Sequence, residues 1–303
     1  MPIALVSSPP RRAYLGGLAL AVVGAIFFSA KAIVAKLMYR YQVDAVMVIS
    51  LRMMFSLPMF AVVAIWQARS SPSLSWRDRA RIVFLGLIGY YLSSFLDFLG
   101  LQYISAGLER LILFLTPSFV LLISFVFFKR KVVLLEWAAL LVSYIGTALV
   151  LMHDLHVGGD HVGLGSLLVL GAAITYALYL IFSGELVRRV GPLRLVAYAM
   201  CVSSVACILQ FFLLRPVGAL VQPMAVYQLS MFNAVFCTVL PVFLTMIAVA
   251  RIGAPTAAQA GLVGPVSTLF MGAVILNEPI TGLQLAGTAL VLSGIYMLSR
   301  RNR

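Results

Sequence analysis

Polar side chains follow one helix face within the apolar segment 81–102. Four residues recur at spacings of four, four and three: Gly86, Tyr90, Ser94 and Asp97. This spacing places them on a single face of a helix. Hydroxyl and carboxylate groups that face lipid are costly, so this face should look into protein or water. It would form either a polar contact between helices or, as we favour, the wall of a cavity in which Tyr90, Ser94 and Asp97 contact a small solute.

Among the charged side chains inside apolar segments, Lys31, Arg52 and Asp97 stand out. An isolated charge there costs at least about 2.5–3.5 kcal/mol on insertion scales. Lys31 and Asp97 lie at a similar depth, and Arg52 falls in the same outer half of the membrane. We therefore predict that Asp97 pairs with Lys31 or Arg52. The positive charge left over would attract a substrate carboxylate, which makes Lys31 a candidate binding residue. The alternative is that Lys31 extends its ammonium group to the membrane interface.

Aromatic and hydroxyl side chains in other apolar segments complete the candidate pocket. These are Phe114, Tyr176, Tyr179 and Thr238. A mixed polar and aromatic pocket suits substrates that combine an apolar or aromatic side chain with a zwitterionic backbone. Each tyrosine taken singly has a structural alternative, as a packing residue between helices.

Prolines occupy equivalent positions in the middle of two apolar segments. Pro117 and Pro265 each remove a backbone donor and clash with the carbonyl one turn earlier. Gly261 loosens the second of these segments further. Membrane helices tolerate a static kink of this kind. We expect instead a pair of hinges, at Pro117 and at Gly261 with Pro265, that open the two sides of the cavity.

The sequence lacks the patterns typical of a membrane-embedded hydrolase. It contains no Gly-x-Ser-x-Gly or His-Glu-x-x-His motif, and no predicted span carries a carboxylate pair, so no catalytic residue is expected. All three histidines lie in the segment 153–162, together with Asp154 and Asp160. These side chains could bind a metal ion, but a solvated loop is the favoured interpretation. Neither a metal nor a cofactor is therefore expected.

The elements that carry these residues are membrane spans. Of 303 residues, 63% are hydrophobic and only 10% are charged, with a mean hydropathy of +1.07. A soluble surface needs far more charge, and the apolar stretches are long enough to cross a bilayer. The basic residues are scattered between these stretches, which argues against nucleic-acid binding. The prediction is an all-α integral membrane protein with ten transmembrane helices, at about 14–38, 44–66, 81–102, 108–128, 132–152, 163–186, 192–213, 226–250, 257–276 and 281–299.

The second half of the chain repeats the first at a constant offset of 148 residues. Pro117 corresponds to Pro265, and Gly146 to Gly294. Five spans precede the segment 153–162 and five follow it, and an odd number per half inverts the second half in the membrane. The predicted organisation is a five-helix repeat at 1–152, an external linker at 153–162 and an inverted five-helix repeat at 163–303.

Lys and Arg residues are unevenly divided between the two sides of the membrane. Sixteen fall on the side of the termini, and four on the other side: Lys36, Arg40, Arg110 and Arg215. Cytoplasmic loops are enriched in Lys and Arg. Both termini are therefore predicted to be cytoplasmic, and the segment 153–162 external.

Small residues mark the fifth and tenth spans. Ala139, Ser143 and Thr147 recur every four residues, and Gly287 and Gly294 lie in the tenth span. Such faces let helix backbones approach closely. The two spans are expected to pack against each other as a scaffold behind the cavity.

Together these features resemble the drug/metabolite transporter (DMT) superfamily, specifically its ten-helix exporters built of two EamA-type halves. The matching positions are Arg52, the run from Leu101 to Ala106, Pro117, Gly146, Ala254, Pro265, the run from Asn277 to Pro279, and Gly294. The chain departs from the family at the run from Lys129 to Lys131, where an acidic residue is usual. It also has Lys31 where the small cationic-drug exporters of the superfamily carry a glutamate in the first span.

The resemblance implies a transporter of the cell inner membrane that exports small metabolites by alternating access. Amino acids, including aromatic ones, are the favoured substrates. The alternatives are a carrier of nucleotide sugars or lipophilic drugs, a channel, and a membrane-embedded enzyme. The expected partners are the substrate and the lipid bilayer, and a single copy should be functional because its two halves form the site.

Overall fold

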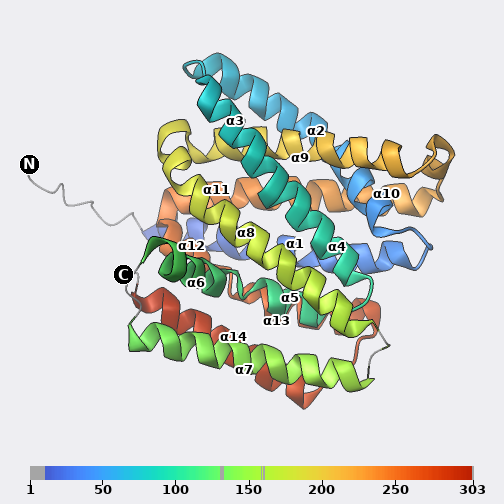
Figure 1. The fold of residues 1–303 in the computed structure, drawn as a ribbon, viewed down its shortest axis with the longest axis vertical. Helices are drawn as coiled ribbons and strands as arrows, with labels where there is room; N and C mark the ends of the chain where they lie inside the picture. The colour runs from blue at the N-terminus through green and yellow to red at the C-terminus, as the bar shows by residue number, and fades with distance from the viewer. Residues whose placement is uncertain (1–10, 130–132, 158, 160, 302–303) are drawn as a thin grey trace, which may run out of the picture.

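The protein is a bundle of apolar helices. The computed structural model describes residues 11–129, 133–157, 159 and 161–301, and this part of the chain contains no strand. It holds eight helical segments that are long and apolar enough to cross a membrane, and two shorter apolar ones, Val263–Leu276 and Gly282–Met297. The ten segments overlap the ten predicted spans, which confirms the all-α membrane architecture (Figure 1).

Short caps and turns divide these segments into named elements. Asp44, Ser75 and Ser105 each accept a hydrogen bond from the backbone N–H three residues later and so begin α2, α3 and α5. The first half contains α1 (Arg11–Tyr39), α2 (Ala45–Ser70), α3 (Trp76–Leu85), the π-helical η1 (Gly86–Leu92), α4 (Ser93–Leu101), α5 (Ala106–Leu113), α6 (Thr116–Phe128) and α7 (Leu134–Val157). The second half contains α8 (Val162–Val190), α9 (Pro192–Leu214), the 3₁₀-helical η2 (Val217–Leu220), α10 (Met224–Ala234), the π-helical η3 (Val235–Val239), α11 (Leu240–Ile252), α12 (Ala254–Ala260), α13 (Val263–Met271), the π-helical η4 (Gly272–Leu276) and α14 (Gly282–Arg301).

Helices of the two halves pack in matched pairs. α1 packs against α11 and α4 against α8, so the first span of each half meets the third span of the other. Equivalent spans also meet, through α2 with α9, α5 with α13, and α7 with α14. The π-helical turns η1 and η3 lie at corresponding positions, because the offset of 148 residues maps 86–92 onto 234–240. This is the arrangement expected of two repeats related by a pseudo-two-fold axis.

The predicted scaffold of the fifth and tenth spans is confirmed. α7 and α14 run along each other at one edge of the bundle (Figure 1). A Cβ atom on Gly146 would lie 2.6 Å from the carbonyl oxygen of Gly287, and one on Gly294 would lie 2.6 Å from that of Ala139. Only glycine lets the two backbones come this close.

The two ends of the described chain lie on the same side of the bundle. α1 begins and α14 ends on the left in Figure 1, whereas the connection from α7 to α8 lies on the right. α7 continues to Val157, past the predicted start of the linker at residue 153. The helix extends because the first helix-breaking residues after it are the glycines at 158 and 159.

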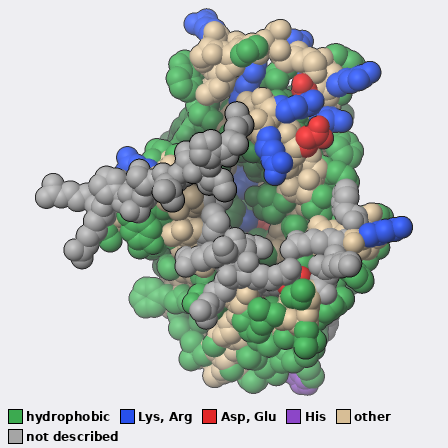
Figure 2. Space-filling view, turned by 90° about the vertical axis from the view of Figure 1, so that its left-hand side faces the viewer, with side chains coloured by type: hydrophobic (Ala, Val, Ile, Leu, Met, Phe, Trp, Pro, Cys, Tyr) green, Lys and Arg blue, Asp and Glu red, His purple; other side chains and the backbone are tan. Residues whose placement is uncertain are grey.

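Buried apolar side chains close the end of the bundle opposite the termini. They come mainly from residues 32–38 of α1 and 45–53 of α2, together with Phe98, Leu101 and Phe211. The face on the side of the termini is different. It carries several Lys and Arg side chains and is hollowed near its centre (Figure 2). The apolar cluster therefore lies toward one end of the bundle, and the hollow lies on the opposite face.

Candidate functional site

A cavity of about 570 Å³ lies between the two halves. This volume is within the range of about 300–1,000 Å³ that is typical of small-molecule sites. Its polar lining residues are Lys31, Arg52, Tyr90, Ser93, Ser94, Asp97, Arg110, Thr116, Tyr176, Thr238 and Gln259. Its apolar lining includes Phe28, Leu113, Phe114, Leu180, Met200 and Val242. A largely apolar cavity with a few convergent polar groups can bind an organic solute in a defined orientation.

The fourth membrane-spanning segment is interrupted beside the cavity. α5 ends at Leu113 and α6 begins at Thr116. Pro117 cannot supply the backbone donor that would reach the Leu113 carbonyl, and the Thr116 hydroxyl donates to that oxygen at 2.7 Å. The break therefore leaves this carbonyl satisfied within the membrane. Phe114 lies between the two helices and lines the cavity.

The ninth segment is interrupted at the equivalent place. α12 ends at Ala260 and α13 begins at Val263, with Pro265 in its first turn. The carbonyl of Gly261, four residues before this proline, accepts the Gly264 N–H at 2.9 Å. Gly261 lines the cavity, and Pro265 is buried behind it. Both proline breaks that the sequence predicts are therefore present.

Three tyrosines form an aromatic cluster in one wall. The ring centroid of Tyr90, on η1, lies 4.9 Å from that of Tyr179 and 6.3 Å from that of Tyr176. The Tyr90 and Tyr179 hydroxyl oxygens are 3.3 Å apart. Gly89 permits this contact, because a Cβ atom there would lie 2.4 Å from the Tyr179 Cβ. Tyr90 and Tyr176 line the cavity, while the buried Tyr179 supports Tyr90 from behind.

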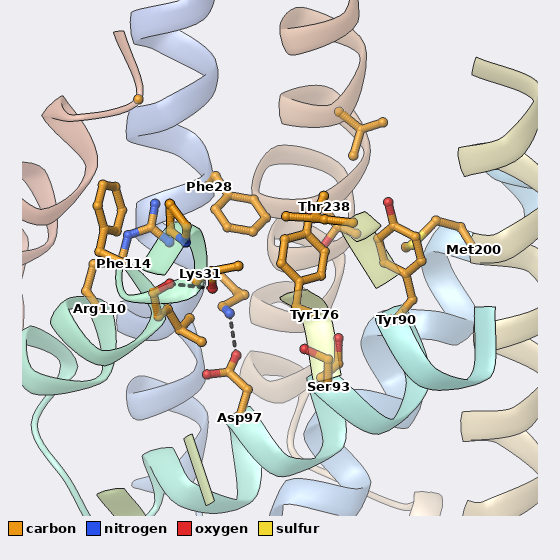
Figure 3. Close-up of a pocket in the computed structure, with 18 of the residues that line it drawn as sticks. Phe28, Lys31, Tyr90, Ser93, Asp97, Arg110, Phe114, Tyr176, Met200 and Thr238 are labelled. Carbon is orange, nitrogen blue, oxygen red and sulfur yellow. Dashed lines mark hydrogen bonds and ion pairs between the residues drawn. The ribbon is translucent and has the colours of Figure 1, made fainter. Parts of the chain in front are cut away.

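Lys31 and Asp97 form an ion pair in another wall. The Lys31 Nζ lies 2.5 Å from the Asp97 Oδ2 (Figure 3) and 3.4 Å from the Glu109 Oε1. The rings of Phe28 and Phe98 flank the ammonium group at 5.5 and 5.3 Å. The predicted partner of Asp97 is therefore Lys31, whose ammonium group is buried in the protein and does not extend to the membrane interface.

Two arginines lie in the same cavity wall. The Arg52 Nη2 donates to the Ser94 hydroxyl at 3.2 Å, and the Arg110 Nη2 donates to the Ser29 hydroxyl at 3.1 Å. Arg52 and Arg110 are only 4% and 6% exposed. The prediction that Arg110 lies in an external segment is therefore wrong. The cap at Ser105 starts α5 before this residue, so the helix carries Arg110 into a membrane-spanning segment.

The cavity brings together most of the predicted binding residues. Figure 3 shows Arg110 and Phe114 at one side of the view, Lys31 and Asp97 pointing toward each other near its centre, and Tyr90 at the other side. The predicted residues that line the cavity are Lys31, Tyr90, Ser94, Asp97, Phe114, Tyr176, Thr238, Pro117 and Gly261. Arg110, which is outside the predicted set, also lines the cavity, and Glu109 contacts Lys31.

The segment with the histidines shows no metal centre where the structure describes it. Among the described residues, no group of three or more His, Cys, Asp or Glu side chains is placed to hold a metal ion. Asp154 accepts the Ser105 hydroxyl at 2.7 Å, and the His156 ring contacts the Met152 carbonyl at 2.6 Å. Asp160 lies outside the described residues.

Both halves of the chain match the same protein-family model. A model of the EamA-like transporter family matches residues 15–152 and 163–300. The chain belongs to this family. The two EamA matches fall on the two halves, and the resemblance to the DMT superfamily that the sequence suggested is confirmed.

Several relatives of this EamA protein are named as transporters. An uncharacterized transporter of Bacillus subtilis is 30% identical over 88% of this chain and 87% of the relative, and one of Archaeoglobus fulgidus is 27% identical over 83% and 87%. A protein of Salmonella typhimurium named "probable amino-acid metabolite efflux pump" is 24% identical over 75% of this chain and 80% of its own length. A solved crystal structure shares the fold with a TM-score of 0.65 at 16% identity, covering 95% of this chain and 98% of the other. The chain is therefore a multi-pass membrane transporter of the EamA family.

Proposed function

We propose that this EamA transporter is a secondary carrier that exports small metabolites, with amino acids as the favoured class, by alternating access. The observation that carries the proposal is the cavity between two related halves, which the apolar packing closes at one end. A carrier needs a central site that is open to one side at a time. An open pore would have no such closed end, so the packing argues against a permanently open channel.

The chemistry of the cavity supports amino acids as substrates. The charged residues Lys31, Asp97 and Arg110 suit the polar backbone of an amino acid, and Tyr90 and Tyr176 suit an apolar or aromatic side chain. The name of the Salmonella relative points in the same direction. A nucleotide sugar or a lipophilic drug is the alternative substrate class.

The orientation in the membrane is also part of the proposal. The distribution of Lys and Arg supports an inner-membrane protein with both termini in the cytoplasm and the linker at 153–162 outside. In this orientation the hollowed face opens to the cytoplasm. The repeats at 1–152 and 163–303 would then rock about the breaks at Pro117, Gly261 and Pro265 to open the other end, within a single copy of the chain.

Uptake into proteoliposomes tests this function. The purified full-length protein would be supplied with radiolabelled leucine, phenylalanine, glutamate and lysine, and in parallel with a nucleotide sugar and a lipophilic drug, with and without a pH gradient. We expect saturable uptake of at least one amino acid, and counterflow when unlabelled substrate is trapped inside. Unsaturated flux without counterflow would indicate a channel. Saturable flux of a nucleotide sugar or a lipophilic drug alone would indicate the alternative substrate class.

A further inference from the structure

We propose that Arg110 is an anion-binding subsite of the cavity, and that it binds the carboxylate group of the transported solute. This inference rests on the proposed transport function. It assigns one chemical group of the substrate to one residue, and it moves the carboxylate-binding role that the sequence suggested for Lys31 to a neighbouring cation.

The buried charges at the cavity are unequally compensated. The ammonium group of Lys31 contacts both carboxylates, Asp97 at 2.5 Å and Glu109 at 3.4 Å. Within the described part of the chain, neither Arg52 nor Arg110 has a carboxylate oxygen within 4.0 Å of its guanidinium nitrogens. The acidic side chains therefore neutralise Lys31 and leave the two arginines with uncharged partners.

Arg110 is fixed in place by uncharged groups. Its Nη2 donates to the Ser29 hydroxyl at 3.1 Å, and the rings of Phe28 and Phe114 lie 5.1 and 5.2 Å from its Cζ. Its Nε is buried and has no hydrogen-bond partner among the described residues. A buried charge ordinarily has an ionic partner. A guanidinium group binds a carboxylate through two parallel hydrogen bonds, so a ligand carboxylate would supply that partner.

The facing helix is shaped around this guanidinium group. A Cβ atom on Gly264 would lie 2.8 Å from the Arg110 Nη2 and 3.1 Å from the Ser29 Oγ, so a larger residue here would displace the guanidinium group. Gly264 is in the first turn of α13, a helix of 9 residues. The N-terminal end of a helix carries a partial positive charge, which adds to the attraction for an anion at this point.

Arg110 also lies where the two halves meet. It belongs to α5, on one side of the break before Pro117, and it contacts α13, which follows the break at Gly261. An anion bound there would be held close to both interrupted helices. Arg52 has partners of the same kind, the Phe98 ring at 4.7 Å and the Ser94 hydroxyl, but it lies on α2, which is continuous from Ala45 to Ser70.

The proposed ligand is an organic carboxylate whose apolar part extends toward the aromatic cluster. Arg110 and Phe114 lie at one side of the cavity, and Tyr90 lies across it at the other side (Figure 3). A neutral amide of the same shape would occupy the same volume but would leave the guanidinium group without its anionic partner. The site should therefore discriminate between a carboxylate and its amide.

Ligand-induced thermal stabilisation of the purified full-length protein tests this inference. The probes are phenylalanine, phenylalaninamide, 3-phenylpropanoate and 3-phenylpropanamide. We expect each carboxylate to bind the wild-type protein at least about tenfold more tightly than its amide, because hydrogen bonds to charged groups are the stronger ones. Arg110→Gln should remove this preference.

Arg194→Gln is the matched control. Arg194 is also 6% exposed and lies 5.6 Å from the Tyr198 ring, but it donates to the Pro72 carbonyl at 2.9 Å and is not among the residues that line the cavity. This variant should keep the full preference for carboxylates. The comparison of carboxylate and amide on the wild-type protein needs no variant, so it stands even where Arg110→Gln fails to fold.

Three results would overturn the subsite. They are equal affinities of carboxylates and amides for the wild-type protein, an undiminished preference in folded Arg110→Gln, and no binding of either carboxylate. Saturable amino-acid transport that amides inhibit as strongly as carboxylates would overturn the subsite and leave the proposed function intact. A carboxylate preference that depends on Arg110, without any amino-acid transport, would support the subsite and overturn the proposed function.

Discussion

Lys31 and Asp97 are 66 residues apart in the sequence, and their side chains meet between α1 and α4 with 2.5 Å between Nζ and Oδ2. Both residues are buried. The Asp97 Oδ1 and both Glu109 carboxylate oxygens have no hydrogen-bond partner among the described residues. The ammonium group of Lys31 therefore lies against two buried carboxyl groups, and Asp97 is the nearer of them.

Asp97→Asn is expected to destabilise the protein by about 3–5 kcal/mol, because removing one member of a buried ion pair leaves the other charge uncompensated. The double variant Asp97→Asn with Lys31→Met should recover part of the loss. Thermal unfolding of the detergent-purified protein measures both effects. Strictly additive losses would contradict the coupling.

Asp78→Asn is the control for this pair. Asp78 is bound by Arg189, whose side chain is 48% exposed. An ion pair of this kind contributes only about 0–1 kcal/mol. If Asp78→Asn lowered the free energy of unfolding as much as Asp97→Asn, burial of the ion pair would not determine the size of the loss.

The sequence predicts the ion pair because depth and helix face can be read from the apolar pattern. The spacing from Gly86 to Asp97 identifies one polar face, and Lys31 lies at the same depth in another span. Glu109 and Arg110 were missed because two adjacent opposite charges at the edge of an apolar stretch look like a loop. Ser105 is the signal that predicts their position, because a serine there can cap a helix that starts before both residues.

The detailed shape of the cavity could not be predicted in the same way. The sequence indicates breaks at Pro117 and Pro265, because proline removes a backbone donor. The π-helical turn at Gly86–Leu92 leaves no comparable signal, since its residues are apolar or aromatic like those of an ordinary span. Tyr90 lies on that turn, and Tyr179 lies behind it, whereas the sequence predicts Tyr179 at the cavity surface.

Gly146→Ala is expected to separate α7 from α14 and to destabilise the protein by about 1–3 kcal/mol, the usual cost of overpacking. The reason is the 2.6 Å distance between an added Cβ atom and the Gly287 carbonyl oxygen. Gly184→Ala is the control, because an added Cβ atom there meets nothing within 4 Å. Equal melting temperatures for the two variants would contradict the scaffold contact.

Pro117→Ala restores a backbone donor at the break between α5 and α6 and should make this segment a more continuous helix. If the break is used in transport, uptake should fall several-fold while ligand binding persists. Proteoliposome flux and thermal stabilisation by the ligand measure the two separately. Pro58→Ala is the control, because Pro58 lies inside α2 on an exposed face. Unchanged flux in Pro117→Ala would make this proline a packing residue.

Cysteine labelling tests the orientation in the membrane. In a variant without Cys201, Cys207 and Cys237, a cysteine at Ser73 should react only from the cytoplasmic side and one at Gly159 only from outside. Both positions are exposed and lie between membrane-spanning segments. External labelling at Ser73 with protection at Gly159 would reverse the proposed orientation.

Tyr176→Leu tests the role of the aromatic cluster in substrate choice. Tyr176 lines the cavity, and its ring is stacked on that of Tyr179 with 5.6 Å between centroids. Leucine keeps an apolar side chain but removes the aromatic contact, and aromatic pairs contribute about 0.5–1.5 kcal/mol beyond their buried area. The affinity for phenylalanine should therefore fall by roughly two- to tenfold relative to that for leucine. Competition assays in proteoliposomes measure this ratio.

Tyr144→Leu is the control. The Tyr144 ring packs on Phe119 and is absent from the cavity lining, so this variant should leave the ratio unchanged. An equal loss for both substrates in Tyr176→Leu would show that this tyrosine shapes the cavity without selecting the side chain.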